Sequence, residues 1–146
     1  MQKLCIFGQR IAMTKHEIVL MSITGEDKPG VTSSLTEILS KHNATILDIG
    51  QANIHQSLSL GILFRLDPVM QGNILKDLLF KSYELGVQAK FTPIERADYD
   101  QWVSRQGKES YVITVLGQKI EANQLAHVTK VIAEQGLNIY TFKRFI

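Results

Sequence analysis

The sequence is poor in the residues that cross-link, interrupt or strongly charge a chain. Of its 146 residues one is cysteine and three are proline, and the formal net charge is only +2. The single Cys5 cannot form an internal disulfide, and with four scattered histidines it offers no zinc-ligand spacing. A reducing, cytoplasmic setting without a metal or other cofactor is therefore the expectation. The weak net charge, without a basic cluster, argues against nucleic acid as a partner.

Long apolar runs are also missing. No stretch approaches the about 18 residues that a membrane-spanning helix needs, although 45% of the residues are hydrophobic. We therefore expect a soluble globular protein with no membrane partner. Residues 1–13 have little patterning and too weak an apolar stretch for a secretory signal. We interpret them as an N-terminal extension and Met13 as the biological start, which mass spectrometry of the native N-terminus would test.

A strand, a turn and a helix make up the best-patterned part of the chain. Residues 18–23 are nearly all apolar and lead to Gly25, which is typical of a buried strand. Pro29 is expected near the first turn of the helix that follows, with Thr32 or Ser33 helping to cap it, and Asn43 is expected to end it. The apolar side of this helix contains Val31, Leu35, Ile38, Leu39 and His42.

The next segments alternate in type. Residues 45–53 favour a strand, residues 55–57 a hairpin connection, and residues 58–66 a strand whose apolar residues recur at every second position. A helix from about residue 70 to the glycine at position 86 and a strand over 87–92 follow. The order is βαββαβ, which predicts an α+β fold, the ferredoxin-like plait, over residues 14–94 with both helices on one face.

The remaining third of the chain predicts part of a second such unit. Residues 95–110 are charge-rich and are interpreted as a linker with one helical turn around Trp102. Residues 111–116 then repeat the first strand, Gly117 corresponds to Gly25, and Gly136 takes the place of Asn43. Residues 111–146 are therefore expected to form the first βαβ half of a second plait. Its unpaired strand edges would dock on the first domain or on a partner subunit.

The turn from Gly25 to Thr32 is the main candidate binding site. It has the glycine spacing of a phosphate loop, but Val31 stands where the lysine would be and two acidic residues precede it. Backbone N–H groups at a helix start suit a carboxylate, and the acidic residues suit an ammonium group, so a zwitterionic amino acid fits both. The alternative is that the glycines and proline only make the turn, with Glu26, Asp27 and Lys28 solvated.

Other polar patterns in the sequence give weaker indications of a functional site. Asp98 and Asp100 have the spacing of an aspartate-nucleophile phosphatase, but they do not follow a buried strand, so a solvated linker is the better interpretation. The polar residues of the second strand either line an exposed face or contact a ligand or partner. No Ser/His/Asp or Cys/His set has a distinctive signature. Phe64 is the only aromatic residue on the two central strands, which argues against an RNA-recognition surface.

The sequence 23-ITGEDKPGVT-32, the strand 46-ILDIGQ-51, the βαββαβ order and the repeat together resemble the ACT domain. The resemblance is to the two ACT domains that precede the catalytic domain in bacterial phosphoserine phosphatases, and it covers about residues 14–146. It implies a regulatory, non-catalytic region that senses an amino acid such as L-serine. The phosphatase domain of a full-length protein, and its Mg²⁺, would lie outside this chain.

The resemblance also implies where a ligand would bind, since ACT ligands typically sit where the turn after the first strand of one module meets the second strand of a paired module. The positions that match are Gly25, Asp27, Pro29, Gly30, Val31, Asp48, Gly50, Gln51, Asn53 and, in the second unit, Gly117. Our first hypothesis is an amino-acid sensor that works as a homodimer. The alternatives are a ligand-free dimerisation module and a fragment that retains phosphatase activity.

Overall fold

The computed structural model describes residues 17–67, 71–106 and 110–144, and it separates the chain into two compact units. Unit 1 comprises Met1–Gly107 and unit 2 comprises Lys108–Ile146. The expected N-terminal extension, residues 1–13, lies outside the described residues. No helix in the described ranges is long and apolar enough to cross a bilayer.

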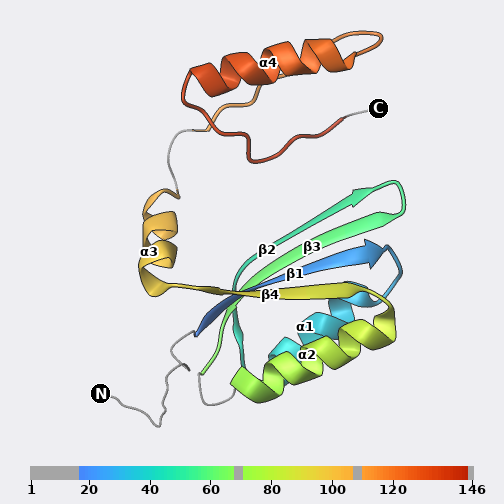
Figure 1. Ribbon diagram of the computed structural model, residues 1–146, viewed down its shortest axis with the longest axis vertical. Coiled ribbons are helices and arrows are strands. Elements are labelled where there is room, and N and C mark those ends of the chain that lie inside the picture. The colour runs from blue at the N-terminus through green and yellow to red at the C-terminus, as the bar shows by residue number, and fades with distance from the viewer. Residues whose placement is uncertain (1–16, 68–70, 107–109, 145–146) are drawn as a thin grey trace. The chain divides into compact units, whose positions relative to one another are not determined.

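Unit 1 has the predicted βαββαβ order and one further helix (Figure 1). Its elements are β1 (Ile18–Glu26), α1 (Val31–Lys41), β2 (Thr45–Ile54), β3 (Ser57–Arg65), α2 (Gln71–Leu85), β4 (Gln88–Ile94) and α3 (Arg96–Ser104). The hairpin connection predicted over residues 55–57 is present as a two-residue turn of His55 and Gln56, and Ser57 already belongs to β3. The ferredoxin-like fold expected for residues 14–94 is therefore confirmed over the described part of that range.

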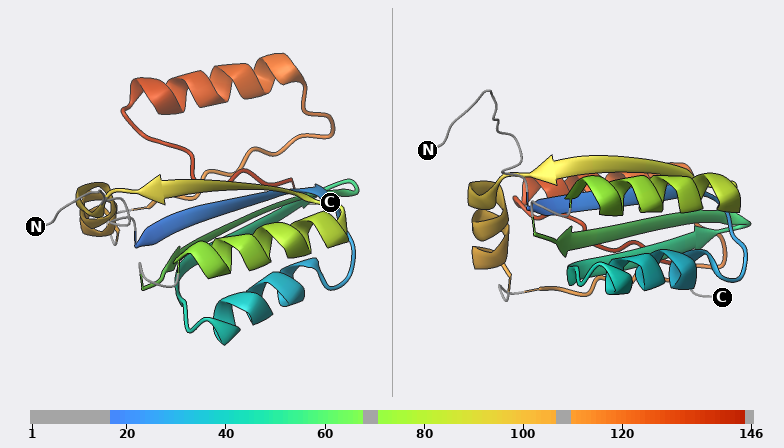
Figure 2. Two further views of the ribbon diagram at one scale, coloured as in Figure 1. Left: turned by 60° about the horizontal axis from the view of Figure 1, so that its bottom comes forward. Right: turned by 90° about the horizontal axis from the view of Figure 1, so that it is seen from below.

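The four strands form one antiparallel sheet in the order β2-β3-β1-β4. β3 and β1 are the central strands, and β2 and β4 are the edges. Helices α1 and α2 lie side by side on the same face of this sheet (Figure 2). Because β3 lies between β2 and β1, β1 does not pair with β2, although the two are joined through α1.

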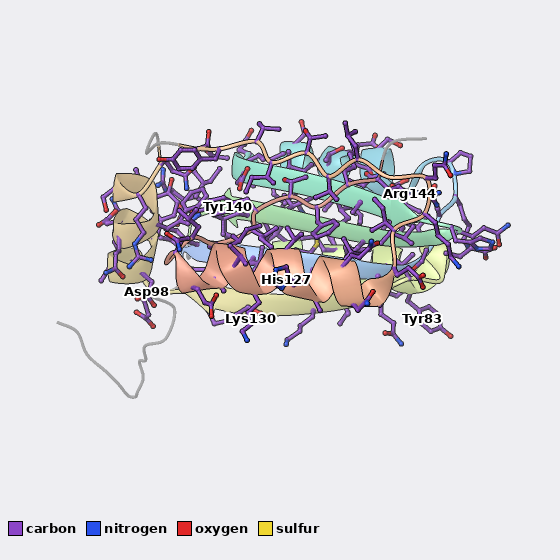
Figure 3. All side chains as sticks on the ribbon, turned by 90° about the horizontal axis from the view of Figure 1, so that it is seen from above. Tyr83, Asp98, His127, Lys130, Tyr140 and Arg144 are labelled. Atoms are coloured by element: carbon purple, nitrogen blue, oxygen red, sulfur yellow. The ribbon has the colours of Figure 1, made fainter. Side chains whose placement is uncertain are left out.

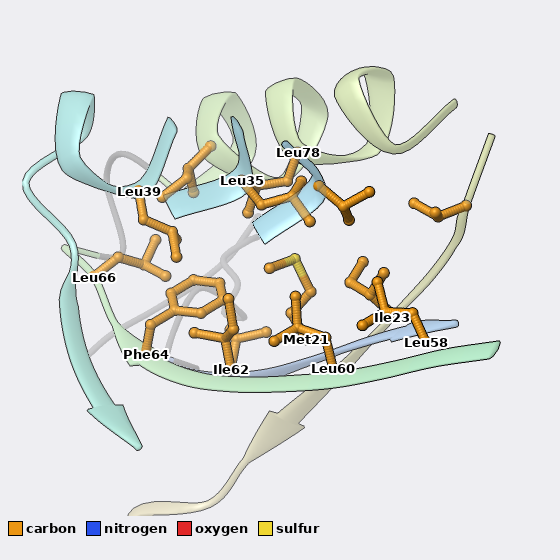
Figure 4. Close-up of a cluster of buried hydrophobic side chains, with 14 residues drawn as sticks. Met21, Ile23, Leu35, Leu39, Leu58, Leu60, Ile62, Phe64, Leu66 and Leu78 are labelled. Carbon is orange, nitrogen blue, oxygen red and sulfur yellow. The ribbon is translucent and has the colours of Figure 1, made fainter. Parts of the chain in front are cut away.

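The core lies between this sheet face and the two helices (Figure 4). Alternate residues of β3 point into it, because successive side chains on a strand face opposite sides of the sheet. The buried residues of the cluster include Met21 and Ile23 from β1, Leu58, Leu60, Ile62 and Phe64 from β3, Leu35 and Leu39 from α1, and Ile74 and Leu78 from α2.

Both core helices end in the same way. Asn43 follows α1 with a φ of 57°, its N–H donates to Ser40 O, and the N–H of Ala44 donates to Leu39 O. This is the Schellman arrangement, which needs a residue in the left-handed region and most often uses glycine. Gly86 plays that part after α2, with a φ of 73°. The prediction that Asn43 ends the first helix is confirmed.

His42 links the two helices. Its Nε2 lies 2.9 Å from Oδ2 of Asp77 on α2, and its side chain is largely buried. The sequence places His42 on the apolar side of its helix, and this contact gives the largely buried imidazole a hydrogen-bond partner.

The predicted linker contains more structure than the sequence suggested. Instead of a single turn around Trp102, α3 spans nine residues and belongs to unit 1. None of its residues is buried, which agrees with the absence of an apolar period in its sequence. Contacts at its surface hold it instead: Arg96 bonds Glu17 at 2.7 Å, and Tyr99 lies beside Trp102 and beneath the guanidinium of Arg65.

Unit 2 contains the predicted helix, α4 (Ala122–Glu134), which starts with a capping box of Glu121 and Gln124. Gly136 ends it with a φ of 74°, in the same Schellman arrangement that Asn43 forms after α1. The strands expected over 111–116 and from 139 onward do not form: the described residues 110–144 contain no strand. The physical reason is that a strand is defined by its ladder, and β3, the common neighbour of β1 and β2, has no counterpart in these residues.

Candidate functional site

The loop between β1 and α1 lies at the end of the sheet that also carries the β2–β3 turn (Figure 1). The backbone N–H of Asp27 donates to the carbonyl oxygen of Gln56 over 2.8 Å. This bond fixes the beginning of the loop on the hairpin. The loop residues from Glu26 to Gly30 are exposed.

Gly30 is the N-cap residue of α1 and has a φ of 94°, which L-residues with a side chain rarely adopt. No side chain caps this helix start. The hydroxyl of Ser33 donates to Gly30 O, so it satisfies an acceptor and not an amide. Pro29 directly precedes the N-cap, near the first turn of the helix as expected. The first amides of α1 are therefore open to an acceptor from outside the helix.

A hydrogen-bonded set of side chains joins this helix start to β2. The Thr32 hydroxyl donates to Gln51 Oε1 at 2.8 Å, and Gln51 Nε2 donates to Asn53 Oδ1 at 3.1 Å. Gln51 and Asn53 oppose Leu60 and Leu58 of β3, so they lie on the helix-facing side of the sheet. From the sequence we predict only a capping role for Thr32. Its position as the second residue of the helix gives no indication of the contact with β2.

Two predicted residues of the same strand lie on the other face. Asp48 opposes Leu63 and Gly50 opposes Gly61, both of which point away from the helices. The cause is a bulge between Ile46 and Asp48, which adds one residue and changes the face of everything after it. The Asp48 carboxylate accepts from the N–H of Ile49 at 3.0 Å. Asp48 and Gly50 are thus not brought together with the N-terminus of α1.

Two residues of the turn serve packing. A Cβ on Gly25 would lie 2.8 Å from Cγ1 and 3.2 Å from Cα of Val87, so only glycine fits here without movement. The Val31 side chain is buried in the core. Either residue could contribute only its backbone to a ligand.

The three charged residues of the turn do not act alike. The carboxylates of Glu26 and Asp27 are exposed and have no hydrogen-bond or ion-pair partner within the described chain. The Lys28 ammonium instead lies against the end of α2, 3.4 Å from the position a Cβ of Gly86 would occupy. There it faces the negative end of that helix. The acidic residues therefore dominate the open part of the loop.

The remaining candidates lie elsewhere. Gly117 belongs to unit 2 and is exposed. Asp98 and Asp100 lie on α3, where Asp100 pairs with Arg96 at 3.5 Å, and they do not follow a buried strand. No group of three or more potential metal ligands occurs in the described ranges.

Comparison with known proteins places this geometry in a family. The ACT domain matches residues 17–92, more than half of the chain. The phosphoserine phosphatase SerB2 of Mycobacterium tuberculosis is 37% identical over 124 residues, which cover 83% of this chain and 29% of that protein. The protein MK1213 of Methanopyrus kandleri is 30% identical over 70 residues, which cover 47% of this chain and 78% of that protein.

A solved structure has the same fold at low sequence identity. It is a protein provisionally described as a glycine cleavage system transcriptional repressor, with a TM-score of 0.56, 11% identity, and coverage of 82% of this chain and 66% of that one. The resemblance expected from the turn and the second strand is confirmed by these matches. The chain belongs to the ACT domain family.

Proposed function

We propose that unit 1 is a regulatory module that binds a small amino acid, such as L-serine, where the N-terminus of α1 meets β2. The observation that carries this proposal is the bridge from Thr32 through Gln51 to Asn53, beside a helix start that no side chain caps. Polar side chains are held in place around a group of open backbone donors. Such pre-organisation supports a role in binding a small polar ligand, in preference to the alternative that the turn is only solvated.

The chemistry suits both ends of a zwitterion. The amides at the start of α1, at the positive end of the helix dipole, would receive the carboxylate. The side-chain oxygens of Gln51 and Asn53 and the carboxylate of Asp27 would receive the ammonium group. Gly30 suits this position, because it adopts a φ of 94° at low cost and adds no side chain beside the start of the helix. Asp48 and Gly50, on the opposite face, are left out of this site.

The module would regulate a phosphatase. The relative from Mycobacterium tuberculosis is a phosphoserine phosphatase, and this chain spans less than a third of its length. We infer that occupancy of the site changes the activity of a catalytic domain outside this chain, which would hold the Mg²⁺ and the nucleophile. No catalytic residue is proposed within the chain.

A second candidate is a ligand-free dimerisation module. The edge strand β2 supports it, because Ile49 and Ile54 are exposed on a strand with one unpaired edge. Edge-to-edge pairing of two copies would extend the sheet and would place two binding loops near each other. In this case amino acids would change neither the mass nor the stability of the protein.

Calorimetry with a panel of amino acids separates the two candidates. The first predicts heat with L-serine or a close relative and a rise in melting temperature that grows with ligand concentration. The second predicts a dimer by sedimentation and no heat with any amino acid. Absence of binding across the whole panel would overturn the sensor proposal. Release of phosphate from phosphoserine by the purified chain would contradict both candidates.

A further inference from the structure

The helix-facing side of β2 changes in character along the strand. Beyond the bulge this side consists of Ile49, Gln51 and Asn53, each of which opposes a core residue of β3. Ile46 lies on the same side before the bulge. Gln51 and Asn53 belong to the hydrogen-bonded set that starts at Thr32, whereas the two isoleucines lie toward the beginning of the strand. An aliphatic surface of Ile46 and Ile49 therefore adjoins the polar residues of the proposed site.

The rest of the chain leaves this aliphatic surface partly open. Ile46 is 42% and Ile49 is 47% exposed, although Phe64 and Ile62, their direct partners on β3, are fully buried. The cause is the position of β2 at the edge of the sheet: the core cluster formed by the described residues contains none from β2. Single exposed apolar residues are ordinary, but two on one side of a strand, next to fixed polar groups, offer apolar contact to a bound molecule.

The residues beside this surface offer little to a polar side chain. Thr36 follows Thr32 by one turn on the same side of α1, and its hydroxyl bonds the helix backbone, at 2.9 Å from the carbonyl oxygen of Thr32 and 3.1 Å from that of Ser33. Asp48, the one charged residue in the sequence of β2, lies on the opposite face. A polar or charged group of a ligand would therefore find neither a charged partner nor a free hydroxyl hydrogen among them.

The spacing along β2 suits the side chain of an amino acid. Ile49 lies two positions before Gln51 on the same face, which is about 7 Å along a strand. In the proposed site the carboxylate of the ligand lies at the first amides of α1 and its ammonium group near the oxygens of Gln51 and Asn53. The side chain is then free to extend toward Ile49. Two or three carbon atoms are enough to reach it, since van der Waals contact itself spans about 4 Å.

Other exposed apolar side chains of unit 1 lie away from this site. Phe80 and Tyr83 of α2 are 65% and 85% exposed, and Tyr83 projects outward from its helix (Figure 3). Asp77 of α2 contacts α1 through His42, whereas α1 contacts β2 through Thr32. The apolar surface of α2 thus belongs to another part of unit 1, while the aliphatic surface of β2 is continuous with the polar residues of the site.

We propose that Ile49 determines which amino acid unit 1 binds, and that the site prefers a short aliphatic side chain, such as that of L-valine, to the hydroxymethyl group of L-serine. This preference rests on the proposed function of unit 1 and concerns the same site. The methyl groups of valine leave water when they cover Ile49, whereas a serine hydroxyl there would lose hydrogen bonds to water and gain none. We expect L-valine to bind about tenfold more tightly than L-serine.

Calorimetry with L-valine and L-serine on the full chain tests this preference. Ile49→Ser should raise the dissociation constant for L-valine about tenfold and change that for L-serine less than about twofold. Ile54→Ser is the matched control and should keep the preference, because Ile54 is an exposed isoleucine on the opposite face of the same strand. Ile49→Thr keeps a β-branched side chain suited to a strand and should also reduce the preference, so the test does not depend on the folding of Ile49→Ser.

The outcomes separate this inference from the proposed function. Equal or tighter binding of L-serine by the unchanged chain would overturn the inference and leave the amino-acid site in place. A preference for L-valine that persists in Ile49→Ser and Ile49→Thr would do the same. Absence of heat with every amino acid of the panel would overturn the proposed function as well.

Methyl NMR on protein with labelled isoleucine tests the contact directly. The signals that disappear in Ile49→Val and in Ile54→Val belong to these two residues. Addition of L-valine should shift the signal of Ile49 and leave that of Ile54 in place. A signal of Ile49 that responds to protein concentration and not to L-valine would show that a second copy covers this residue, and would overturn the proposal.

Discussion

The hydroxyl of Thr32 on α1 donates a 2.8 Å hydrogen bond to the side-chain oxygen of Gln51 on β2. This contact joins two elements that are 19 residues apart in sequence, and it does so beside the open amides of α1. Because Gln51 also donates to Asn53, its position is fixed from two sides. If an amino acid binds here, Gln51 is the residue through which the helix start and the edge strand act together.

Gln51→Ala should therefore weaken amino-acid binding. Loss of one hydrogen-bonding side chain costs about 1 kcal/mol, which corresponds to a dissociation constant raised about fivefold. Isothermal titration calorimetry measures this change. Asp48→Ala is the matched control, because Asp48 lies on the same strand but on the opposite face. Equal weakening in the two variants would show that the ligand is not held where Gln51 faces α1.

The sequence allowed most of unit 1 to be predicted, because its signals are local. The period of two from Leu58 to Phe64 and the glycine after α2 depend only on neighbouring residues. The candidate site was predictable only in part. The bulge between Ile46 and Asp48 determines which polar residues of β2 reach the helix side, and nothing in the sequence marks it. Thr32 was missed as a contact to β2, since pairing across 19 residues leaves no local pattern.

The strands of unit 2 show a different limit. The apolar pattern of residues 111–116 repeats that of β1, yet the described segment forms no strand. An apolar pattern indicates which side of a strand would be buried. Strand pairing also requires a neighbouring segment with free backbone N–H and C=O groups. α3 is the opposite case. Its sequence has no apolar period, yet a helix forms, and contacts such as that of Arg96 with Glu17 hold it.

Asn43→Gly should stabilise unit 1. Asn43 has a φ of 57°, a conformation that costs a residue with a side chain more than it costs glycine, and the Schellman bonds around it would be kept. We expect the free energy of unfolding in urea to rise by about 0.5 kcal/mol. Ser40→Gly, inside the last turn of α1, is the control and should lower that free energy. A fall in both variants would mean that chain entropy outweighs the relief at position 43.

Neighbouring leucines of α2 should respond differently to truncation. Leu78 is fully buried against the sheet, and Leu79 is 55% exposed. Leu78→Ala should lower the free energy of unfolding by about 2 to 5 kcal/mol, since it removes transfer energy and leaves a cavity. Leu79→Ala should change it by less than about 0.5 kcal/mol. Urea denaturation followed by circular dichroism measures both, and similar losses would contradict the assigned orientation of α2.

Gly25→Ala distinguishes a packing role from a binding role at the first residue of the predicted site. The new Cβ would lie 2.8 Å from Cγ1 and 3.2 Å from Cα of Val87, so Val87, which directly precedes β4, must move, at a cost of about 1 to 3 kcal/mol. Gly50→Ala is the control, because a Cβ there meets no atom within 4 Å. Urea denaturation should show a loss for Gly25→Ala alone. If Gly25→Ala retained full stability while losing amino-acid binding, the glycine would serve the ligand and not the packing of β1 against Val87.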